Sequence, residues 1–357
     1  MSARELFRVE GLPVLQNKVY ATVVEAMASP IGDVVLSQDL DTGLVFNSAF
    51  DPSLLVYDEE YQNEQAVSSV FRRHLDDVLD IVGSHFRGKT LIEVGCGKGY
   101  FLELLRSAGF AATGIDPAYE GDSPHVIRAP FEAGLGLAAD GIVLRHVLEH
   151  MQDPVRFLQS IAAANAGAGL IYIEVPCFDW ICSHRAWFDI FYEHVNYLRL
   201  SDFTRMFGRV LESGHIFGGQ YLYVVADLAS LRVPNASGSD AVEFPPGFSA
   251  GIAASTQVAL SATGKRKALW GASSKGVIFS NHMRRAGIEF DMAIDMNPAK
   301  QQRYIATTGL RIVAPETAIK TLAPGSLVFV MNSNYFEEVV AQSGNAFHYV
   351  KVDQHEL

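Results

Sequence analysis

The chain has 357 residues, of which 49% are hydrophobic and 19% charged, and this balance suits a globular protein of two or three domains. Its formal net charge of −12 argues against a nucleic-acid partner, because phosphate binding draws on clustered lysine and arginine side chains. The first residues lack the pattern of a secretory signal, and no run approaches the roughly 20 apolar residues that cross a bilayer, so we expect a cytoplasmic protein without a membrane segment.

The first half of the chain leads into an alternation of strands and helices. Residues 1–66 mix short strand-like runs with turns, and they predict an extension rather than an independent domain. A helix is expected over 66–82, where apolar residues recur at near-helical spacing beside a charged face. The expected strands are 90–94, 111–115, 141–144 and 169–175. This alternation predicts a mostly parallel sheet with helices on its faces.

A second alternating unit follows a stretch of linker residues near positions 231–240. It begins with a strand over 267–270, continues through a turn and a helix ending at Arg285, and reaches a strand that ends at Asp295. The predicted fold is therefore α/β, with two Rossmann-like units in tandem. The expected limits of the three parts are 1–66, 67–238 and 239–357.

A glycine-rich loop, Glu93-Val-Gly-Cys-Gly-Lys-Gly99, follows the strand over 90–94 and opens a helix. In that context glycine lets the backbone turn sharply and leaves no Cβ in the way of a ligand. The G-x-G-x-G spacing is tighter than the dinucleotide fingerprint, and Glu93 suits the cationic amino end of S-adenosylmethionine. Asp116, at the end of the next strand, can accept hydrogen bonds from two ribose hydroxyls.

Together with Gly114-Ile-Asp-Pro117 and Leu144-Arg-His-Val-Leu-Glu-His-Met-Gln-Asp-Pro154, this loop resembles the class I S-adenosylmethionine-dependent methyltransferases. The resemblance implies S-adenosylmethionine as cofactor and S-adenosylhomocysteine as product. The residues that it places at the cofactor are Glu93, Gly95, Cys96, Gly97, Gly99, Asp116, Pro117, Ala129, Phe131, Arg145 and His146. Glu149 and His150 also belong to the family pattern, and a packing or capping role is an equally open interpretation.

Acid–base chemistry is expected in the segment Trp187-Phe-Asp-Ile-Phe-Tyr-Glu-His-Val-Asn-Tyr197, which follows a strand at the edge of the sheet where ligands bind. His194 can take a proton near neutral pH, with Glu193 orienting its ring. Tyr192 and His150 are reserve candidates. The alternative is a buried packing histidine beside a surface glutamate.

From about residue 50 onward, the chain resembles the sugar C-methyltransferases that act on nucleotide-linked keto-deoxysugars. These enzymes combine an N-terminal, usually zinc-binding region, a methyltransferase core and a C-terminal Rossmann-like domain. The matching segments include Phe71-Arg-Arg-His74, Glu193-His194, Gly218-Gly219, Trp270-Gly-Ala-Ser-Ser-Lys-Gly276 and Asp295-Met-Asn-Pro-Ala-Lys300. The resemblance implies C-methylation of a small keto compound by deprotonation at His194, and it makes Tyr61 a lid over the cofactor.

Two features depart from this family. The N-terminal CxxC pairs are missing, and the cysteines at 96, 177 and 182 have no zinc-ligand spacing, so we expect no metal. The family pattern Tyr-His-Glu-His is Phe191-Tyr-Glu-His194 here, so its acid/base tyrosine is lost unless Tyr192 or Tyr197 replaces it.

Several functions stay open at this point. An O- or N-methyltransferase would depend less on His194, and a non-catalytic protein would bind S-adenosylmethionine without a pocket beside its methyl group. Nicotinamide-dependent redox chemistry is suggested by Asp295 following Gly271, yet the turn between them lacks G-x-G-x-x-G. Gly271, Lys275 and Asn297 either shape the substrate cleft or serve structure alone. The oligomeric state is left open.

Overall fold

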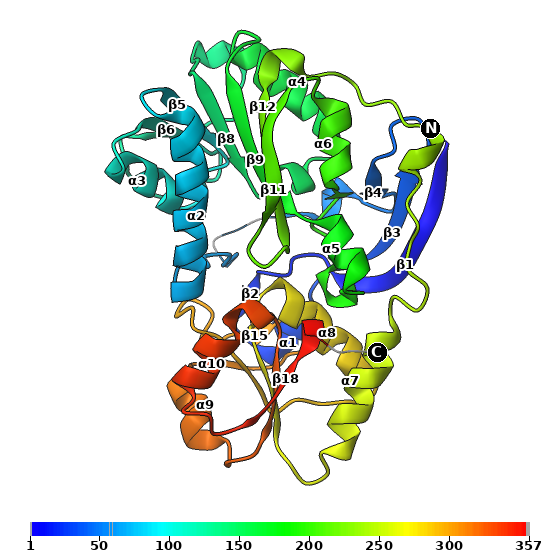
Figure 1. Cartoon of the computed structure of the whole chain (residues 1–357). Coiled ribbons are helices and arrows are strands. Elements are labelled where there is room, and N and C mark those ends of the chain that lie inside the picture. Colours follow the sequence, from blue (N-terminus) through cyan, green and yellow to red (C-terminus); the bar gives the residue numbers. More distant parts are fainter. Residues whose placement is uncertain (1, 57, 59, 355–357) are drawn as a thin grey trace.

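The computed structural model describes residues 2–56, 58 and 60–354, which form two stacked α/β units with an N-terminal sheet along one flank (Figure 1). Tyr57 and Glu59, near the expected lid residue Tyr61, lie outside the described residues, as do residue 1 and residues 355–357 at the ends of the first and last expected parts. Within the described chain, no helix combines the length and the apolar character needed to span a membrane.

The larger unit is built on a seven-stranded sheet in the order β11-β12-β9-β8-β5-β6-β7. The five strands from β5 to β9 pair in parallel, and β12 runs antiparallel to both of its neighbours. The order reverses between β5 and β8, so a crevice opens at the carboxyl ends of these strands. The bounds are β5 (Thr90–Val94), β6 (Ala111–Ile115), β7 (Val126–Ile127), β8 (Gly141–Arg145), β9 (Leu170–Pro176), β11 (Val210–Ile216) and β12 (Tyr221–Asp227).

Helices cover both faces of this sheet, as the alternating pattern predicted. The helix expected from residue 66 begins instead at Ser69, because the Ser68 hydroxyl caps it by accepting the N–H groups of Val70 and Phe71. It buries Phe71, Leu75 and Val78 on one face at helical spacing. The helices are α2 (Ser69–Phe86), α3 (Tyr100–Ser107), α4 (Pro154–Ala164), α5 (Phe178–Ser183) and α6 (Leu200–Met206).

The smaller unit holds a five-stranded, fully parallel sheet in the order β16-β14-β13-β17-β18. Parallel strands joined by helices confirm the second Rossmann-like unit. Its strands are β13 (Lys267–Trp270), β14 (Met292–Ile294), β16 (Ile312–Val313), β17 (Leu327–Val330) and β18 (His348–Lys351). Its helices are α7 (Ala250–Ser261), α8 (Ser274–Arg285), α9 (Pro315–Thr321) and α10 (Phe336–Gln342).

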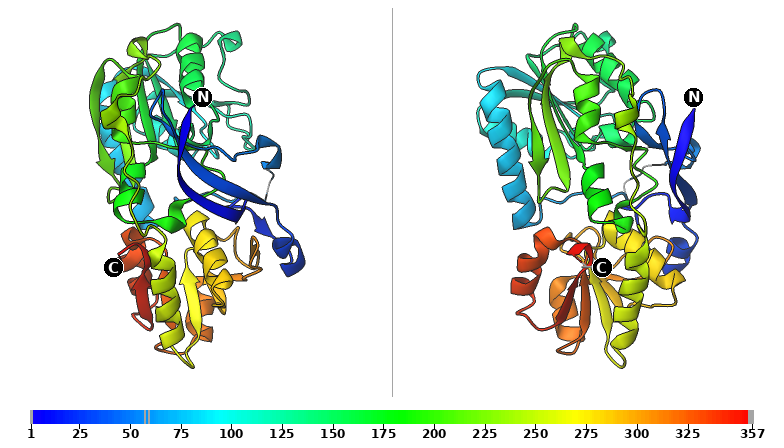
Figure 2. Two further views of the ribbon diagram at one scale, coloured as in Figure 1. Left: turned by 90° about the vertical axis from the view of Figure 1, so that its right-hand side faces the viewer. Right: turned by 45° about the vertical axis from the view of Figure 1, so that its right-hand side comes forward.

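The N-terminal extension contacts both units, as the two views of Figure 2 show for its blue strands. Its main sheet has the order β1-β3-β4-β10, and its last strand, β10, belongs to the core and begins two residues after His194. A second small sheet pairs β2 with β15 of the C-terminal unit. The bounds are β1 (Ala3–Pro13), β2 (Val19–Tyr20), α1 (Val23–Met27), β3 (Ile31–Asp39), β4 (Val45–Asn47), β10 (Asn196–Tyr197) and β15 (Tyr304–Ile305).

One continuous cluster of buried apolar side chains joins the three parts, with Leu36, Phe178 and Phe279 among its members. Between the core and α8, the rings of Trp187 and Phe279 stack with centroids 5.6 Å apart. Because removal of this apolar surface from water stabilises the contact between the parts, the segment 187–197 is held between the two units rather than on the open surface.

Candidate active site

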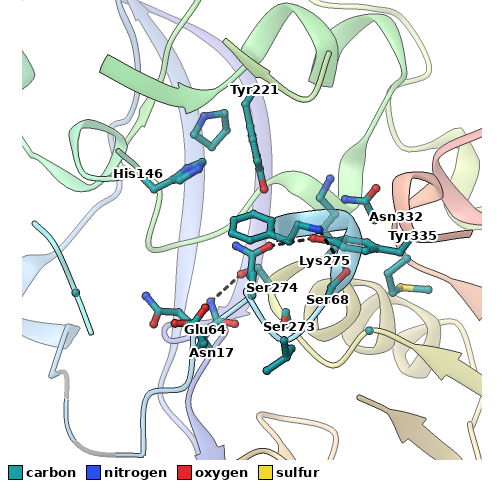
Figure 3. A pocket seen from close by; sticks show the side chains of 18 of the residues that line it. Asn17, Glu64, Ser68, His146, Tyr221, Ser273, Ser274, Lys275, Asn332 and Tyr335 are labelled. Carbon is teal, nitrogen blue, oxygen red and sulfur yellow. Dashed lines mark hydrogen bonds between the residues drawn. The ribbon is translucent and has the colours of Figure 1, made fainter. Parts of the chain in front are cut away.

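A cavity of about 390 Å³ lies where the core, the N-terminal extension and the C-terminal unit meet. This volume falls within the range of small-molecule sites. In Figure 3, His146 and Tyr221 reach toward it from the core, and Ser274, Lys275 and Tyr335 face it from the C-terminal unit. The residues of the sequence predictions that line it are Tyr61, Glu93, Gly95, Cys96, Gly97, Arg145, His146, Glu149, His150, Glu193, His194, Gly271 and Lys275, whereas Asn297 is not among the lining residues.

The glycine loop after β5 has the backbone shape for which glycine was expected. Gly95, Gly97 and Gly99 have φ values of +75°, +53° and +82°, in the left-handed region that other residues rarely adopt. A Cβ at Gly95 would lie 2.4 Å from a methyl carbon of Val147, whereas a Cβ at Gly97 would meet open space. The loop therefore packs tightly on one side and leaves room for a ligand on the other.

Asp116 holds this loop in place. Its Oδ2 accepts the N–H of Gly97 at 2.8 Å, and its Oδ1 accepts the N–H of Ala118 at 2.8 Å. Hydrogen bonds to a carboxylate are stronger than neutral ones, so the end of β6 fixes the turn that follows β5. The contact of Asp116 with ribose remains a prediction.

Five expected cofactor residues lie outside the lining of the cavity, namely Gly99, Asp116, Pro117, Ala129 and Phe131. Gly99 caps the start of α3, and Phe131 is 7% exposed and belongs to the apolar core. The segment around Ala129 follows β7, the edge strand of the sheet, and the interpretation that it lies beside the adenine stays a prediction.

Glu93 supplies the cavity with a buried acid. Its side chain is 3% exposed, and its Oε2 has no hydrogen-bond partner among the described residues. Burial raises the pKa of the Glu93 carboxyl to about 8, although Arg145 opposes this shift. A buried acceptor without a partner costs free energy that a cationic ligand would recover. The site therefore fits the ammonium end of S-adenosylmethionine.

The floor of the cavity rests on a buried network around Glu174, which is fully buried on β9. Its carboxylate accepts from Arg145 Nε at 2.7 Å and lies 2.8 Å from His74 Nε2 and 3.1 Å from His146 Nε2. Burial works against the charge of Glu174, but Arg145 and His146 hold its pKa well below the ordinary value. The sequence analysis missed this residue, although a lone acid inside the apolar strand Leu170–Pro176 was a signal for it.

His146 connects this network to a second carboxylate. Its backbone has φ +52°, which is unusual for a residue other than glycine. Its Nδ1 lies 3.4 Å from Glu149 Oε1. Burial lowers the pKa of His146, but Glu174 and Glu149 together raise it to about 9. His146 is therefore an imidazolium at neutral pH, bonded to a carboxylate on each side.

The proton-transfer candidates His150 and His194 lie together at the cavity, with ring centroids 5.1 Å apart. His150 Nδ1 is 2.9 Å from the carbonyl oxygen of Glu193, and a carbonyl only accepts, so Nδ1 carries the proton. Burial holds the pKa of His194 well below its ordinary value, and the neighbouring His150 adds to this shift. At neutral pH His194 is therefore uncharged and able to accept a proton.

Neither tyrosine that was considered as a substitute for Phe191 reaches the cavity. The Tyr192 hydroxyl accepts the N–H of Asp51 and donates to its carbonyl, at 2.8 and 3.2 Å, while its ring packs where a Cβ on Gly32 would stand. The Tyr197 hydroxyl makes the same pair of bonds to the backbone of Phe191, each 3.0 Å long. This geometry does not support Tyr192 as a reserve catalytic group or Tyr197 as a substitute for Phe191, and both roles stay untested predictions.

Side chains of the kinds that bind metals gather in two places among the described residues. His74, His146 and Glu174 form one group, and Glu149, His150 and His194 form the other, with one nitrogen or oxygen from each residue within 4.8 Å of the other two. The imidazolium of His146 belongs to the first group and touches the second, so a metal dication would meet positive charge at both. We assign a metal to neither group, and the expectation of none stays a prediction.

Comparison with known proteins matches two family models to the chain. Residues 66–210 match a family model described as a methyltransferase domain, and residues 253–349 match one described as a C-methyltransferase C-terminal domain. The chain carries a methyltransferase domain and a C-methyltransferase C-terminal domain. The strand order of its larger sheet agrees with the class I methyltransferase core that the sequence motifs resemble.

Individual relatives match parts of the chain. The C-methyltransferase NovU of Streptomyces niveus is 25% identical over 52% of this chain and 49% of its own length. A ubiquinone biosynthesis O-methyltransferase of Caulobacter vibrioides is 30% identical over 25% of this chain and 41% of its own. The chain thus spans about half, or less, of the length of these relatives. The solved plantazolicin methyltransferase BpumL, a complex with S-adenosylhomocysteine, is 16% identical over 46% of this chain and 85% of its own, with a TM-score of 0.35.

Proposed function

We propose that this protein transfers a methyl group from S-adenosylmethionine to a carbon atom of a small molecule, next to a carbonyl group. The observation that carries the proposal is the cavity itself, because the glycine loop with Glu93 and the neutral His194 both line it at the junction of the two units. As the acceptor we propose a nucleotide-linked keto-sugar or a related metabolite.

Three features of the cavity near the glycine loop support binding of the cofactor there. Glu93 is suited to the cofactor's amino group, and Gly97 leaves room beside the loop. Lys98 Nζ donates to Gln62 Oε1 at 2.9 Å, so the loop is tied to the segment of Tyr61, which also lines the cavity. This bond supports the role of Tyr61 as a lid over the cofactor.

The acceptor side is supported by the second domain. Ser273, Ser274, Lys275 and Asn332 line the cavity from the C-terminal unit, and these side chains suit the hydroxyl and carbonyl groups of a sugar. The match of this unit to a C-methyltransferase C-terminal domain, and the likeness to NovU, favour carbon as the methylated atom. The relatives that are O-methyltransferases match about a quarter of the chain.

The residues at the cavity indicate how a carbon nucleophile would form. Bound S-adenosylmethionine supplies an electrophilic methyl group. His194 removes the proton from the carbon beside the acceptor carbonyl, for which a neutral ring is required. The stacked domains hold the acceptor in place and exclude water, and positioning of this kind supplies much of the rate in displacement reactions.

The proposal is tested by mass spectrometry of metabolite and nucleotide-sugar pools incubated with the protein and S-adenosylmethionine. We expect one acceptor to gain the mass of a methyl group, with deuterium from a labelled methyl retained on carbon. For that acceptor, His194→Ala should lower kcat by roughly 10²–10⁴-fold, the usual contribution of a general base. A labelled methyl found on oxygen or nitrogen, or full turnover by His194→Ala, would refute C-methylation through His194.

A further inference from the structure

The loop that carries His194 is clamped against the short helix η3 (Leu148–His150). On one side, the N–H of Val195 donates to the carbonyl oxygen of Glu149 at 2.8 Å. On the other side, His150 Nδ1–H donates to the carbonyl oxygen of Glu193 at 2.9 Å. Because these two bonds flank His194 in the sequence, its position relative to η3 is well defined.

The Glu149 side chain points into this clamp from η3. It is 2% exposed, and its Oε2 has no hydrogen-bond partner among the described residues. A carboxylate oxygen of Glu149 lies within 4.8 Å of a ring nitrogen of His150 and of His194. A buried carboxylate oxygen without a donor is costly, so a donor is expected at some stage of the reaction.

The carboxylate of Glu193, by contrast, is turned toward the N-terminal extension. Its Oε2 accepts the backbone N–H of Gln16 at 2.9 Å in a buried contact. This bond ties the loop before β10 to the residues after β1. Glu193, which the sequence analysis predicted as the partner of His194, therefore anchors this loop to the N-terminal extension.

We propose that Glu149 is the positioning residue of His194, accepting a ring N–H and stabilising the imidazolium that forms when His194 takes a proton. This inference rests on the proposed function and deepens it. The acceptor's C–H proton passes to His194, and the electron pair left behind forms the new C–C bond as the S–CH₃ bond breaks. The proton stays on the His194 ring in this step, and the side chain of Glu149 stabilises the positive charge that appears there.

The surroundings of the pair favour this assignment. The charged and titratable groups that face it are His146 from the end of β8, Glu149 and His150 from η3, Glu193 from the same loop and Lys275 from α8. His146, Lys275 and His150 oppose a positive charge on His194, so an imidazolium there needs a carboxylate close by. His146, whose Nδ1 lies 3.4 Å from Glu149 Oε1, helps to fix that carboxylate in place.

The test follows the ring nitrogens of His194 by NMR in ¹⁵N-histidine-labelled protein saturated with S-adenosylhomocysteine, with signals assigned through His194→Gln. Glu149→Gln should change the ¹⁵N shifts of His194 and lower the pH at which its ring protonates by about 1–3 units, the usual effect of losing an adjacent opposite charge. Glu193→Gln, which removes the rival carboxylate, should change these signals less than Glu149→Gln does. A purely structural role of Glu149 would not produce this difference.

The inference is overturned if His194 gives the same signals in the wild type and in Glu149→Gln, or if only Glu193→Gln changes them. If Glu149→Gln does not fold, Glu149→Asp, which keeps the charge but retracts it, should shift the signals in the same direction by less. Calorimetry with S-adenosylhomocysteine separates the two levels of proposal. A wild type that fails to bind refutes the proposed function, whereas unchanged signals in a protein that binds refute only the role of Glu149.

Discussion

At the scale of single residues, the site contains carboxylates whose surroundings give them different tasks. Glu174 is ionised because Arg145 and His146 surround it. The pKa of Glu93 is raised instead, and burial is the main cause. The same side-chain chemistry therefore serves as a fixed negative charge on β9 and as a titratable acid at the end of β5. The second kind is suited to a cationic ligand, because the ligand's charge replaces the proton.

We expect Glu93 to release a proton when the ligand binds. Its pKa of about 8 keeps the carboxyl mostly protonated at pH 7, and a bound ammonium group favours the ionised form. Binding of S-adenosylhomocysteine at pH 7 should thus release close to one proton, and the release should vanish well above pH 8. Calorimetry in buffers of different ionisation enthalpy measures this number.

The matched variants for that measurement are Glu93→Gln, which should bind without proton release, and Glu103→Gln, an exposed acid on α3 that should behave as the wild type. Undiminished release in Glu93→Gln would assign the proton to another group.

At the scale of elements, neighbouring strand ends hold one another's loops. Asp116, after β6, bonds the glycine loop after β5, and β10 pairs with β4 of the N-terminal sheet beside His194. The N–H of Asn47 in β4 also donates to the carbonyl oxygen of Val195 at 2.7 Å. The extension thus positions the loop of His194 by backbone hydrogen bonds, without a zinc-ligand pattern in its sequence.

Asp116→Ala should loosen the glycine loop. A hydrogen bond to a charged group contributes roughly 1.5–3 kcal/mol, so the loss of the bond to Gly97 should weaken binding of S-adenosylhomocysteine by about 10–100-fold. Calorimetry measures the affinity, and thermal unfolding checks that the fold is retained. Asp122→Ala, an exposed acid in the following loop, is the control and should bind normally. Equal affinity in the two variants would show that Asp116 does not support the loop.

At the scale of the whole molecule, polar bonds join the core to the C-terminal unit around the cavity. Lys275 Nζ lies 3.0 Å from Asp189 Oδ2, and both side chains are largely buried. Glu338 of α10 accepts the hydroxyl of Ser68 and the N–H of Ser69 at the start of α2, at 2.6 and 2.9 Å. The two units are therefore fixed to each other at the point where cofactor and acceptor would meet.

Removal of one partner of the Lys275–Asp189 pair should cost more than removal of both. Lys275→Met leaves a buried carboxylate unpaired, and we expect it to lower the free energy of unfolding by about 3–5 kcal/mol. The double variant Lys275→Met/Asp189→Asn should recover most of this loss, because no buried charge remains. Urea unfolding measures both values.

The control pair is Arg209–Asp227 on the surface, where the arginine side chain is 69% exposed and Arg209→Ala should change stability by less than about 1 kcal/mol. Additive losses in the double variant at Lys275 and Asp189 would contradict a buried, mutually dependent pair.

Local patterns in the sequence were sufficient for much of the fold. The strand over 111–115 appears with the predicted bounds, and the order of strand, glycine loop and helix from residue 90 is as expected. These features follow from neighbouring residues, because periodicity, capping and the backbone freedom of glycine act over a few positions. For the same reason, the cofactor class was predictable from the glycine loop and the acidic residues beside it.

Only the tertiary structure decided which side chains meet at the cavity. In it Tyr192 bonds the backbone of Asp51, Asp116 bonds Gly97, and a carboxylate oxygen of Glu149 lies within 4.8 Å of a ring nitrogen of His194. Adjacent residues such as Glu193 and His194 can meet different partners, because each partner comes from a segment far away in the chain. The sequence by itself determined the elements and the cofactor loop, which depend on local physics. The assignment of roles within the site depended on long-range packing, which no local pattern records.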